Sequence, residues 1–309
     1  MDFKPMSGRV LPRFSGVKTF FRLPHVGMNE SYDVGILGVP FDGGVSYRPG
    51  ARFAPSKVRE FSSLGRGYHW SRGINVFDQL KVADIGDCPT VPISLEKSYE
   101  LIEKHLSEVL ALDKRVISIG GDHSITLPLL RAYHKKQGQK LNLVHFDAHL
   151  DTYPAAWGFE YHHGSFVRHA IEEGLVNGEG CIQIGIRGPL AGGDDLEFVN
   201  KHGLQVVTVD DVRDKGIKGV LASLRKLEGP TYLSFDIDCL DPVYAPGTGT
   251  PVPGGLTSYE VQKLLRGLEI KNLVGADIVE VSPPYDPSDI TAITAVDVAF
   301  EILCLMASE

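Results

Sequence analysis

The 309-residue sequence is poor in cysteine and contains no long hydrophobic run. Its four cysteines form no Cys-x-x-Cys pair and suggest no disulfide framework: Cys88, Cys181, Cys239 and Cys304. No apolar stretch approaches the roughly 20 residues of a transmembrane helix, and the opening segment MDFKPMSGRVLPRF has no apolar run of signal-peptide length. These absences argue against a membrane protein and a disulfide-stapled secreted domain, and we expect the chain to act in the reducing cytoplasm.

The sequence also lacks an excess of positive charge. It has 31 Lys and Arg residues against 39 Asp and Glu residues, which gives a formal net charge of −8. Because nucleic-acid binding depends on clustered basic residues, this balance argues against nucleic acid as a partner. Hydrophobic residues make up 43% of the chain and charged residues 23%, values that are ordinary for a globular protein with a large core.

Short apolar runs rich in β-branched residues alternate with segments of helical periodicity. The apolar runs predict buried strands at residues 34–39, 116–119, 143–146, 182–186, 206–209, 232–237 and 274–281. The helical segments lie at residues 95–112, 258–268 and 292–306, and Ser124 is expected to cap a further helix over ITLPLLRAYHKK. This alternation predicts an α/β protein with a mainly parallel sheet and helices on both faces. We expect a single domain at 32–309, preceded by an extended arm at 1–31 that lies on the surface or on a neighbouring subunit.

Histidines and aspartates follow three of the predicted strands. They are His123 after the second strand, Asp147, His149 and Asp151 after the third, and Asp236 and Asp238 after the sixth. Residues two apart on a strand share a face, and open parallel sheets bind ligands beyond the carboxyl ends of their strands, so we expect these side chains to converge. Four buried carboxylates would repel one another unless cations neutralise them. The pattern therefore predicts a shared site for two divalent ions, with Mn²⁺ favoured and Ni²⁺, Co²⁺ or Zn²⁺ as alternatives.

The segments that carry these residues resemble characteristic blocks of the ureohydrolase family, which includes arginases, agmatinases, guanidinobutyrases and proclavaminate amidinohydrolases. These segments are GGDHS at 120–124, DAHLD at 147–151, SFDIDCLDP at 234–242 and EVSPPYD at 280–286. Similar blocks extend the resemblance over nearly the whole chain: SYRPGARFAP at 46–55, YHHGSF at 161–166, QIGIRG at 183–188 and APGTGTP at 245–251. The resemblance implies the three-layer αβα sandwich of the arginase type and a homotrimer or homohexamer, with a paralogous subunit as a further option.

The resemblance also implies how the ligands divide between two manganese ions. One ion would be bound by His123, Asp147, Asp151 and Asp236, and the other by Asp147, His149, Asp236 and Asp238. Asp147 and Asp236 would therefore bridge the two ions. The activity implied is hydrolysis of a cationic guanidino compound to an amine and urea.

Three residues are implied in the chemistry itself. His163 resembles the proton-shuttling histidine, and only the family's His-Gly pattern selects it over the adjacent His162. Glu280 resembles the carboxylate that grips the guanidinium group. Asp151 is expected to accept a hydrogen bond from the attacking oxygen.

The residue two after Asp151 bears on the substrate. Arginases and several guanidino-acid hydrolases carry Asn there, which helps to bind a carboxylate tail, whereas Tyr153 resembles agmatinases. Agmatine, hydrolysed to putrescine and urea, is therefore the leading candidate, and Tyr47 or Arg48 is a candidate to face the substrate. Guanidinobutyrate, guanidinopropionate, proclavaminate-type acids, guanidine and biguanides are alternatives, because other blocks resemble the enzymes of guanidino acids.

Two other classes compete with this hypothesis. A deacetylase-like hydrolase of similar fold would bind a single zinc through three ligands, and the surplus carboxylates argue against it. A non-catalytic partner of an active paralogue would not need the full set of ligands together with His163 and Glu280.

Overall fold

The computed structural model describes residues 3–190 and 192–308, and an eight-stranded sheet forms its centre. The strands of this sheet are β1 (Val34–Val39), β4 (Val82–Asp87), β5 (Arg115–Gly120), β6 (Leu141–Phe146), β7 (Val176–Ile186), β8 (Gln205–Thr208), β9 (Thr231–Asp236) and β10 (Leu273–Val279). Their order is β4-β1-β5-β10-β9-β6-β7-β8, and every pairing is parallel. A small antiparallel pair, β2 (Tyr68–His69) and β3 (Ile74–Asn75), lies apart from it.

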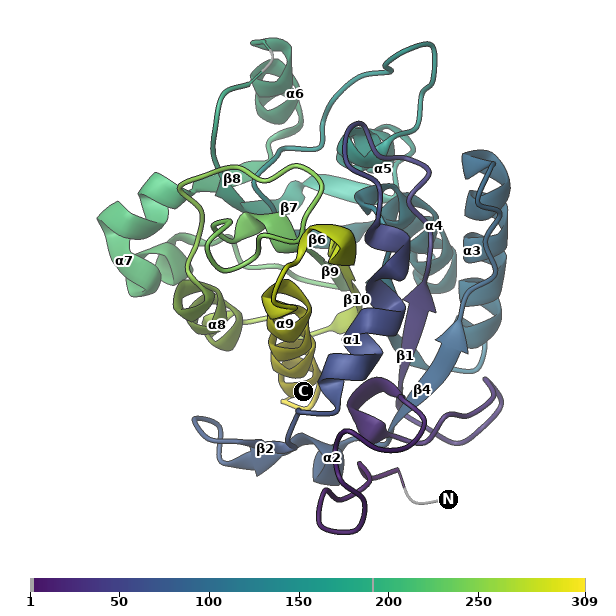
Figure 1. Cartoon of the computed structure of the whole chain (residues 1–309). Coiled ribbons are helices and arrows are strands. Elements are labelled where there is room, and N and C mark those ends of the chain that lie inside the picture. Colours follow the sequence, from purple (N-terminus) through teal and green to yellow (C-terminus); the bar gives the residue numbers. More distant parts are fainter. Residues whose placement is uncertain (1–2, 191, 309) are drawn as a thin grey trace.

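Helices cover both faces of the sheet. One face carries α1 (Ala54–Ser62), α7 (Val209–Ser223), α8 (Ser258–Gly267) and α9 (Ile290–Met306), which Figure 1 shows in front of the strands. The other face carries α3 (Leu95–Leu110), α4 (Thr126–Gln137), α5 (Phe166–Glu172) and part of α6 (Asp194–His202). The core divides accordingly, since Leu264 and Ile302 pack in one cluster and Ile102 and Leu129 in another. The predicted three-layer αβα sandwich is confirmed.

Each predicted run corresponds to a strand, but several ends differ and one edge strand is new. β7 begins at Val176, six residues before the predicted run, and β10 ends at Val279, two residues before the predicted end. β8 stops at Thr208, because the Thr208 side chain accepts a hydrogen bond from the backbone of Asp211 and starts α7 at Val209. The edge strand β4 was not predicted. Its sequence, VADIGD, becomes progressively more exposed towards Asp87, so it lacks the continuous apolar run of a central strand.

The prediction that Ser124 caps a helix is wrong. The Asp122 side chain takes that role, since its Oδ1 accepts a hydrogen bond from Ser124 N at 2.8 Å. One 3-10 turn (His123–Ile125) then precedes α4, which begins at Thr126. The added turn moves the cap position two residues upstream, to the end of the Gly-Gly-Asp segment.

The N-terminal segment packs partly into the core of its own chain. Within residues 3–31, Phe20, Phe21 and Leu23 are buried in the core on the α1 side, and Phe20 N donates to Asp84 Oδ2 at 2.9 Å. Phe14, in contrast, is 84% exposed. Residues 1 and 2 of the predicted arm lie outside the described residues, and contact of the arm with a neighbouring subunit stays a prediction.

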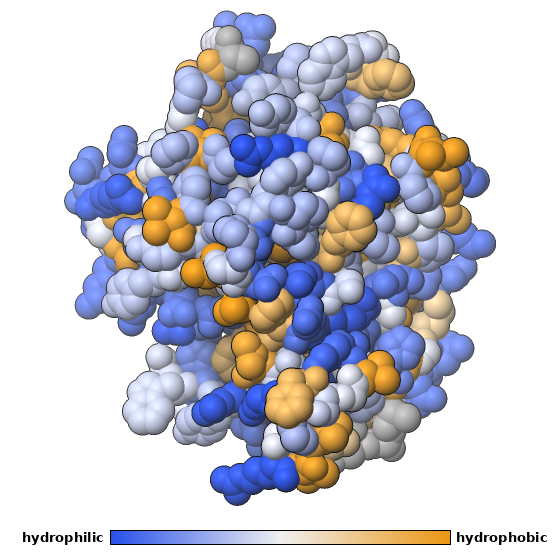
Figure 2. All heavy atoms as spheres, in the orientation of Figure 1, coloured by the Kyte–Doolittle hydropathy of each residue, from blue (hydrophilic) through white to orange (hydrophobic). Residues whose placement is uncertain are grey.

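The surface carries no continuous apolar layer on the face seen in Figure 2, where hydrophobic side chains lie scattered among hydrophilic ones. Among the described residues, we find no helix with the length and apolar content needed to span a bilayer.

A capping box begins α8 and offers a test of local stability. Thr257 Oγ1 accepts from Glu260 N at 3.1 Å, and Glu260 Oε2 accepts from Thr257 N at 2.7 Å. Thr257→Ala leaves one helix N–H without its partner, and we expect the free energy of unfolding to fall by about 0.5–2 kcal/mol. Urea denaturation followed by circular dichroism measures the loss. Ser258→Ala is the matched control, and an equal loss there would contradict the capping role.

Candidate metal centre

The site lies where the central strands of the sheet end. β5, β10, β9 and β6 are consecutive neighbours in the sheet, and their carboxyl ends therefore meet at one edge. His123 follows β5, Asp147 follows β6, Asp236 ends β9 and Glu280 follows β10. The order of the strands thus brings residues that are far apart in the sequence to the same edge of the sheet.

The first group of ligands converges on the ring of His123. His123 Nδ1 lies 3.1 Å from Oδ2 of each of three buried carboxylates: Asp147, Asp151 and Asp236. Four potential ligand atoms therefore surround one point. This donor set, with one imidazole and three carboxylates, matches the oxygen-rich ligation that Mn²⁺ takes up.

The second group shares Asp147 with the first. His149 Nδ1 lies 3.3 Å from Asp147 Oδ1 and 3.1 Å from Asp238 Oδ2. Asp147 thus turns one oxygen towards each group, as a bridging carboxylate requires. The second oxygen of Asp236 accepts the Asp238 backbone N–H at 2.7 Å, and the bridging role of Asp236 stays a prediction.

Turns, rather than strand alternation, bring these residues together. β9 ends at Asp236, and Asp238 lies in a 3-10 helix (Ile237–Cys239) that Asp236 caps. The expectation that Asp236 and Asp238 share the face of a strand is therefore wrong, although their convergence is right. Asp151 adopts a left-handed backbone with φ 51°, a conformation that costs a non-glycine residue about 1–3 kcal/mol. Cys239, next to Asp238, is buried.

The electrostatics of the cluster favour a bound cation. Burial raises the pKa of Asp236 well above its ordinary value, and the neighbouring Asp238 and Asp147 carboxylates raise it further. Burial alone lowers the pKa of His123, but hydrogen bonds to the surrounding carboxylates outweigh it and raise the pKa well above the ordinary value. Carboxylates crowded in this way hold protons unless a metal ion takes their place. The residues present therefore fit a divalent metal centre.

A buried hydrogen-bond chain orients His123. Its Nε2 lies 2.8 Å from Ser234 Oγ, which donates to Asp277 Oδ1 at 2.7 Å. Asp277 also accepts the hydroxyls of Thr126 and Tyr232. The chain holds the Nε2–H towards Ser234 and leaves Nδ1 as the ligand atom. Sequence analysis missed Asp277, because a single acid inside an apolar strand gives no pattern.

His145 lies beside the cluster and orients Asp147. The Gln183 side-chain nitrogen donates to Leu150 O at 2.7 Å and lies 2.9 Å from His145 Nδ1. Because a carbonyl only accepts, this contact fixes the amide nitrogen, and His145 Nδ1 must accept. The proton of the ring is then on Nε2, which donates to Asp147 Oδ2 at 2.8 Å. A protonated Nε2 cannot bind a metal, so His145 positions a ligand and is not one.

This arrangement predicts a measurable effect of Gln183 on metal affinity. Gln183→Leu removes the donor that fixes the His145 ring, and we expect the Mn²⁺ dissociation constant to rise about 10–100-fold. Isothermal titration of the metal-free protein measures the constant. Gln205→Leu is the control, because Gln205 is a half-buried glutamine whose side chain bonds only backbone groups. Equal Mn²⁺ affinity in the two variants would show that Gln183 and His145 do not help to orient the metal ligands.

Glu280 and His163 contact each other beside the proposed ligand His123. Glu280 Oε1 accepts from His123 N at 2.9 Å and lies 3.0 Å from His163 Nδ1, while Glu280 Oε2 is buried without a hydrogen-bond partner. Burial raises the pKa of Glu280, but the charge and hydrogen bond of His163 outweigh it and lower the pKa. Glu280 has φ 61°, a second left-handed backbone at the site. A buried, ionised carboxylate with one oxygen free of hydrogen bonds is suited to bind a cationic ligand.

A cavity of about 470 Å³ reaches His163, whereas Glu280 lies buried outside its lining. Its lining includes Asp151, His163, Tyr153, His162 and Trp157, and it contains no lysine or arginine among the described residues. Ser46 also lines it, a residue that sequence analysis did not single out.

Neither Tyr47 nor Arg48 lines this cavity, contrary to the expectation for that segment. The guanidinium of Arg48 lies over the rings of Tyr47 and Tyr285, 5.5 and 5.2 Å from their centroids. Arg48 therefore packs beside the cavity instead of facing a substrate.

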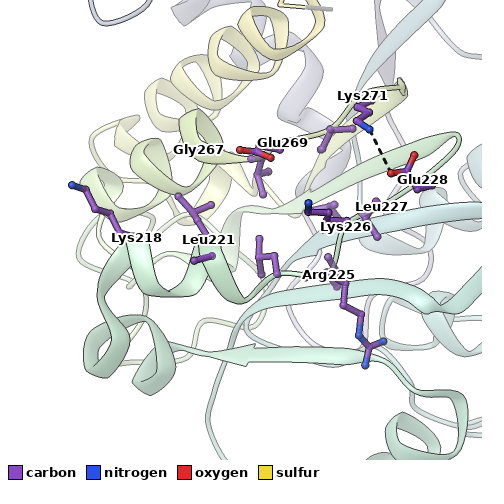
Figure 3. Close-up of a pocket in the computed structure, with 15 residues that line it drawn as sticks. Lys218, Leu221, Arg225, Lys226, Leu227, Glu228, Gly267, Glu269 and Lys271 are labelled. Atoms are coloured by element: carbon purple, nitrogen blue, oxygen red, sulfur yellow. Dashed lines mark hydrogen bonds and ion pairs between the residues drawn. The ribbon is translucent and has the colours of Figure 1, made fainter.

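A second cavity of about 510 Å³ lies away from the cluster, between α7 and α8. Figure 3 shows its lining, with Lys218, Arg225 and Lys226 around an apolar floor and an ion pair between Lys271 and Glu228. No histidine or aspartate lines it among the described residues, and of its two glutamates, Glu228 and Glu269, the first pairs with Lys271.

The parallel sheet and the cluster of histidines and aspartates at its carboxyl edge define an α/β protein with a candidate metal centre. The chain belongs to the arginase family, whose model, described as "Arginase family", matches residues 32–305. The prediction of a ureohydrolase is confirmed.

Three similar proteins illustrate the range of the family. Guanidinopropionase of Pseudomonas aeruginosa is 45% identical over 307 residues, which are 98% of this chain and 96% of that protein. Agmatinase of Edwardsiella ictaluri is 43% identical over 296 residues, 94% of each chain. The solved structure of proclavaminate amidinohydrolase from Streptomyces clavuligerus is 44% identical, with a TM-score of 0.91 and coverage of 96% of this chain and 99% of that chain.

Proposed function

We propose that this protein hydrolyses a guanidino compound to an amine and urea at a centre of two Mn²⁺ ions. The observation that carries the proposal is Glu280 Oε2, a buried carboxylate oxygen without a hydrogen-bond partner, beside two groups of convergent metal ligands. One ion would be held by His123 with Asp147, Asp151 and Asp236, the other by His149 with Asp147, Asp236 and Asp238. When bound, the two ions supply Lewis-acid activation of a water molecule near neutral pH.

The protein's own residues bind the substrate and move protons. Glu280 accepts charge-assisted hydrogen bonds from the guanidinium through Oε2 and so fixes the carbon that is attacked. Asp151 accepts a hydrogen bond from the attacking water. His163 supplies the proton that the leaving amine needs, a role that suits imidazole.

We propose agmatine as the leading substrate. The tail of the substrate would extend past Tyr153 towards Trp157, both of which line the cavity. An ammonium group can rest against aromatic rings, whereas a carboxylate tail would meet no lysine or arginine among the described lining residues. Guanidino acids are the second candidate, because guanidinopropionase and proclavaminate amidinohydrolase are among the similar proteins.

A urea-release screen tests both the activity and the substrate. The substrates are agmatine, arginine, 4-guanidinobutyrate, 3-guanidinopropionate, guanidine and metformin, each with Mn²⁺ and with Ni²⁺. We expect the highest kcat/KM for agmatine with Mn²⁺. Absence of urea from all six would contradict the proposed function, and one ion per chain by elemental analysis would favour the single-zinc class. We also propose a homotrimer or homohexamer that acts in the cytoplasm, which light scattering and cell fractionation test.

Metal removal offers a prediction that needs no substrate. Chelation of the ions leaves the buried carboxylates without their neutralising charge, and we expect the midpoint of thermal unfolding to fall. Free Mn²⁺ at 100 times its dissociation constant adds about 2.7 kcal/mol of stability for each site. Calorimetry of the chelated and the Mn²⁺-loaded protein measures the difference. Equal midpoints would show that the cluster is stable without metal.

A further inference from the structure

The ring of His163 is engaged at both nitrogens. Nδ1 lies 3.0 Å from Glu280 Oε1, and Nε2 lies 2.7 Å from Ser46 Oγ and 3.2 Å from Ser46 N. The His163 side chain is only 12% exposed. Two neighbours therefore take up both positions through which this ring can exchange a proton.

The Ser46 backbone fixes where the ring carries its proton. An amide N–H can only donate, so Nε2 accepts from it, and the proton of the neutral ring is on Nδ1, where Glu280 accepts it. Burial lowers the pKa of His163, but the charge of Glu280 outweighs it and raises the pKa to about 9, so the ring readily takes up a second proton. Because Nδ1 already carries a proton, the second proton binds at Nε2, where the Ser46 hydroxyl lies 2.7 Å away.

Ser46 and His163 both line the cavity, and the Ser46 hydroxyl is the side-chain group that meets His163 Nε2 there. Ser46 is exposed and lines the cavity together with Asp151 and Asp236. A hydroxyl accepts and donates at once, so it serves both protonation states of His163. In the observed arrangement, a proton that leaves Nε2 therefore has this oxygen as its side-chain acceptor, 2.7 Å away.

The loop that carries Ser46 is fixed by buried contacts. Gly44 N donates to Asp122 Oδ2 at 2.7 Å, and His163 N donates to Gly44 O at 2.9 Å. Further along, Gly50 N donates to the buried carboxylate of Asp42 at 2.6 Å. The contact between Ser46 and His163 is thus built into the fold at both ends of the loop.

We propose that Ser46 is a catalytic residue that passes the proton from His163 to the leaving amine. The Nε2–H bond of His163 breaks as its proton moves to Ser46 Oγ, and the hydroxyl proton of Ser46 moves to the amine nitrogen as the carbon–nitrogen bond breaks. Ser46 ends as a neutral hydroxyl, His163 ends neutral, and the proton released by the attacking water recharges His163. This inference rests on the proposed function.

Three variants test the relay. Ser46→Ala removes the hydroxyl, and we expect kcat to fall on the order of 10²-fold, with KM and metal content unchanged. Ser46→Thr keeps a hydroxyl and is expected to restore most of the rate. Tyr47→Phe, which removes the hydroxyl of the next residue, is the matched control, because Tyr47 does not line the cavity. Wild-type kcat in Ser46→Ala, or equal losses in Ser46→Ala and Ser46→Thr, would overturn the relay.

Two further measurements separate the relay from a structural role and from the proposed function. The dependence of kcat on the deuterium fraction of the solvent should be curved in the wild type, where two protons move together, and linear in Ser46→Ala. A linear wild-type plot would overturn the relay. Nitrogen-15 NMR of histidine-labelled protein should show His163 protonated at Nδ1 in the wild type and in Ser46→Ala alike, whether or not urea is released, because the backbone N–H of residue 46 remains in the variant. Loss of the proton from Nδ1 in Ser46→Ala would mean that Ser46 acts by holding the ring, which would overturn the relay. If Ser46→Ala fails to fold, Ser46→Gly, which also lacks the hydroxyl, takes its place in all three measurements.

Discussion

Asp236→Asn is expected to abolish urea release. Asp236 is one of three carboxylates that meet at His123 Nδ1, and an asparagine there removes a full negative charge from the point where a cation is held. Replacement of a residue that only hydrogen-bonds to a metal ligand lowers metal affinity or activity about 10–100-fold. Replacement of a direct ligand should therefore lower kcat/KM by more than about 10²-fold. Urea production and elemental analysis of the purified variant measure the two effects together.

The matched control replaces a carboxylate outside the cluster. Asp210→Asn makes the same chemical change at an exposed position in the first turn of α7, and we expect wild-type activity and two ions per chain. If Asp236→Asn kept both its activity and its full metal content, Asp236 would not be a ligand, and the proposed bridging role would be wrong.

His163→Ala is expected to separate proton transfer from metal binding. His163 contacts Glu280 and Ser46 but no residue of the two ligand groups through a hydrogen bond, so its loss should leave the metal content at two ions. Positioned acid–base groups contribute roughly 10²–10⁴-fold, and we expect kcat to fall within that range. Steady-state kinetics with saturating Mn²⁺ measure it.

The neighbouring histidine provides the comparison for this experiment. His162 Nε2 lies 3.0 Å from Pro154 O, and its ring makes no contact with Glu280 in the described structure. His162→Ala should therefore lower kcat much less than His163→Ala. The reverse order would assign the shuttle to His162, and unchanged urea production in both variants would place proton transfer elsewhere.

The sequence predicted those parts of the fold and site that repeat a simple pattern. Continuous apolar runs identified seven of the eight strands, and the acids and histidines at their ends identified the ligand cluster. Family resemblance selected His163 over His162, and the structure brings His163 to Glu280. The edge strand β4 was not predicted, because Asp84 and Asp87 interrupt its apolar residues and leave no continuous apolar run.

The residues that support the site could not be predicted in the same way. His145, Gln183 and Asp277 stand singly inside strands, and their partners come from other strands, so their roles depend on the pairing of the sheet. Ser46 meets His163 across 117 positions of the sequence. The left-handed backbone of Glu280 is set by the surrounding structure, since glutamate does not favour that conformation.

The proposed ligands and the proposed tail-contacting residues are attached to different kinds of backbone. The proposed ligands lie at the ends of hydrogen-bonded strands or in the turns that directly follow them, whereas Trp157 and most of the residues around it belong to a segment between β6 and α5 with little regular structure, and Trp157 itself is 76% exposed. Replacements in that segment disturb few core contacts. Evolution can therefore exchange the tail a substrate carries while the bond that is broken stays the same.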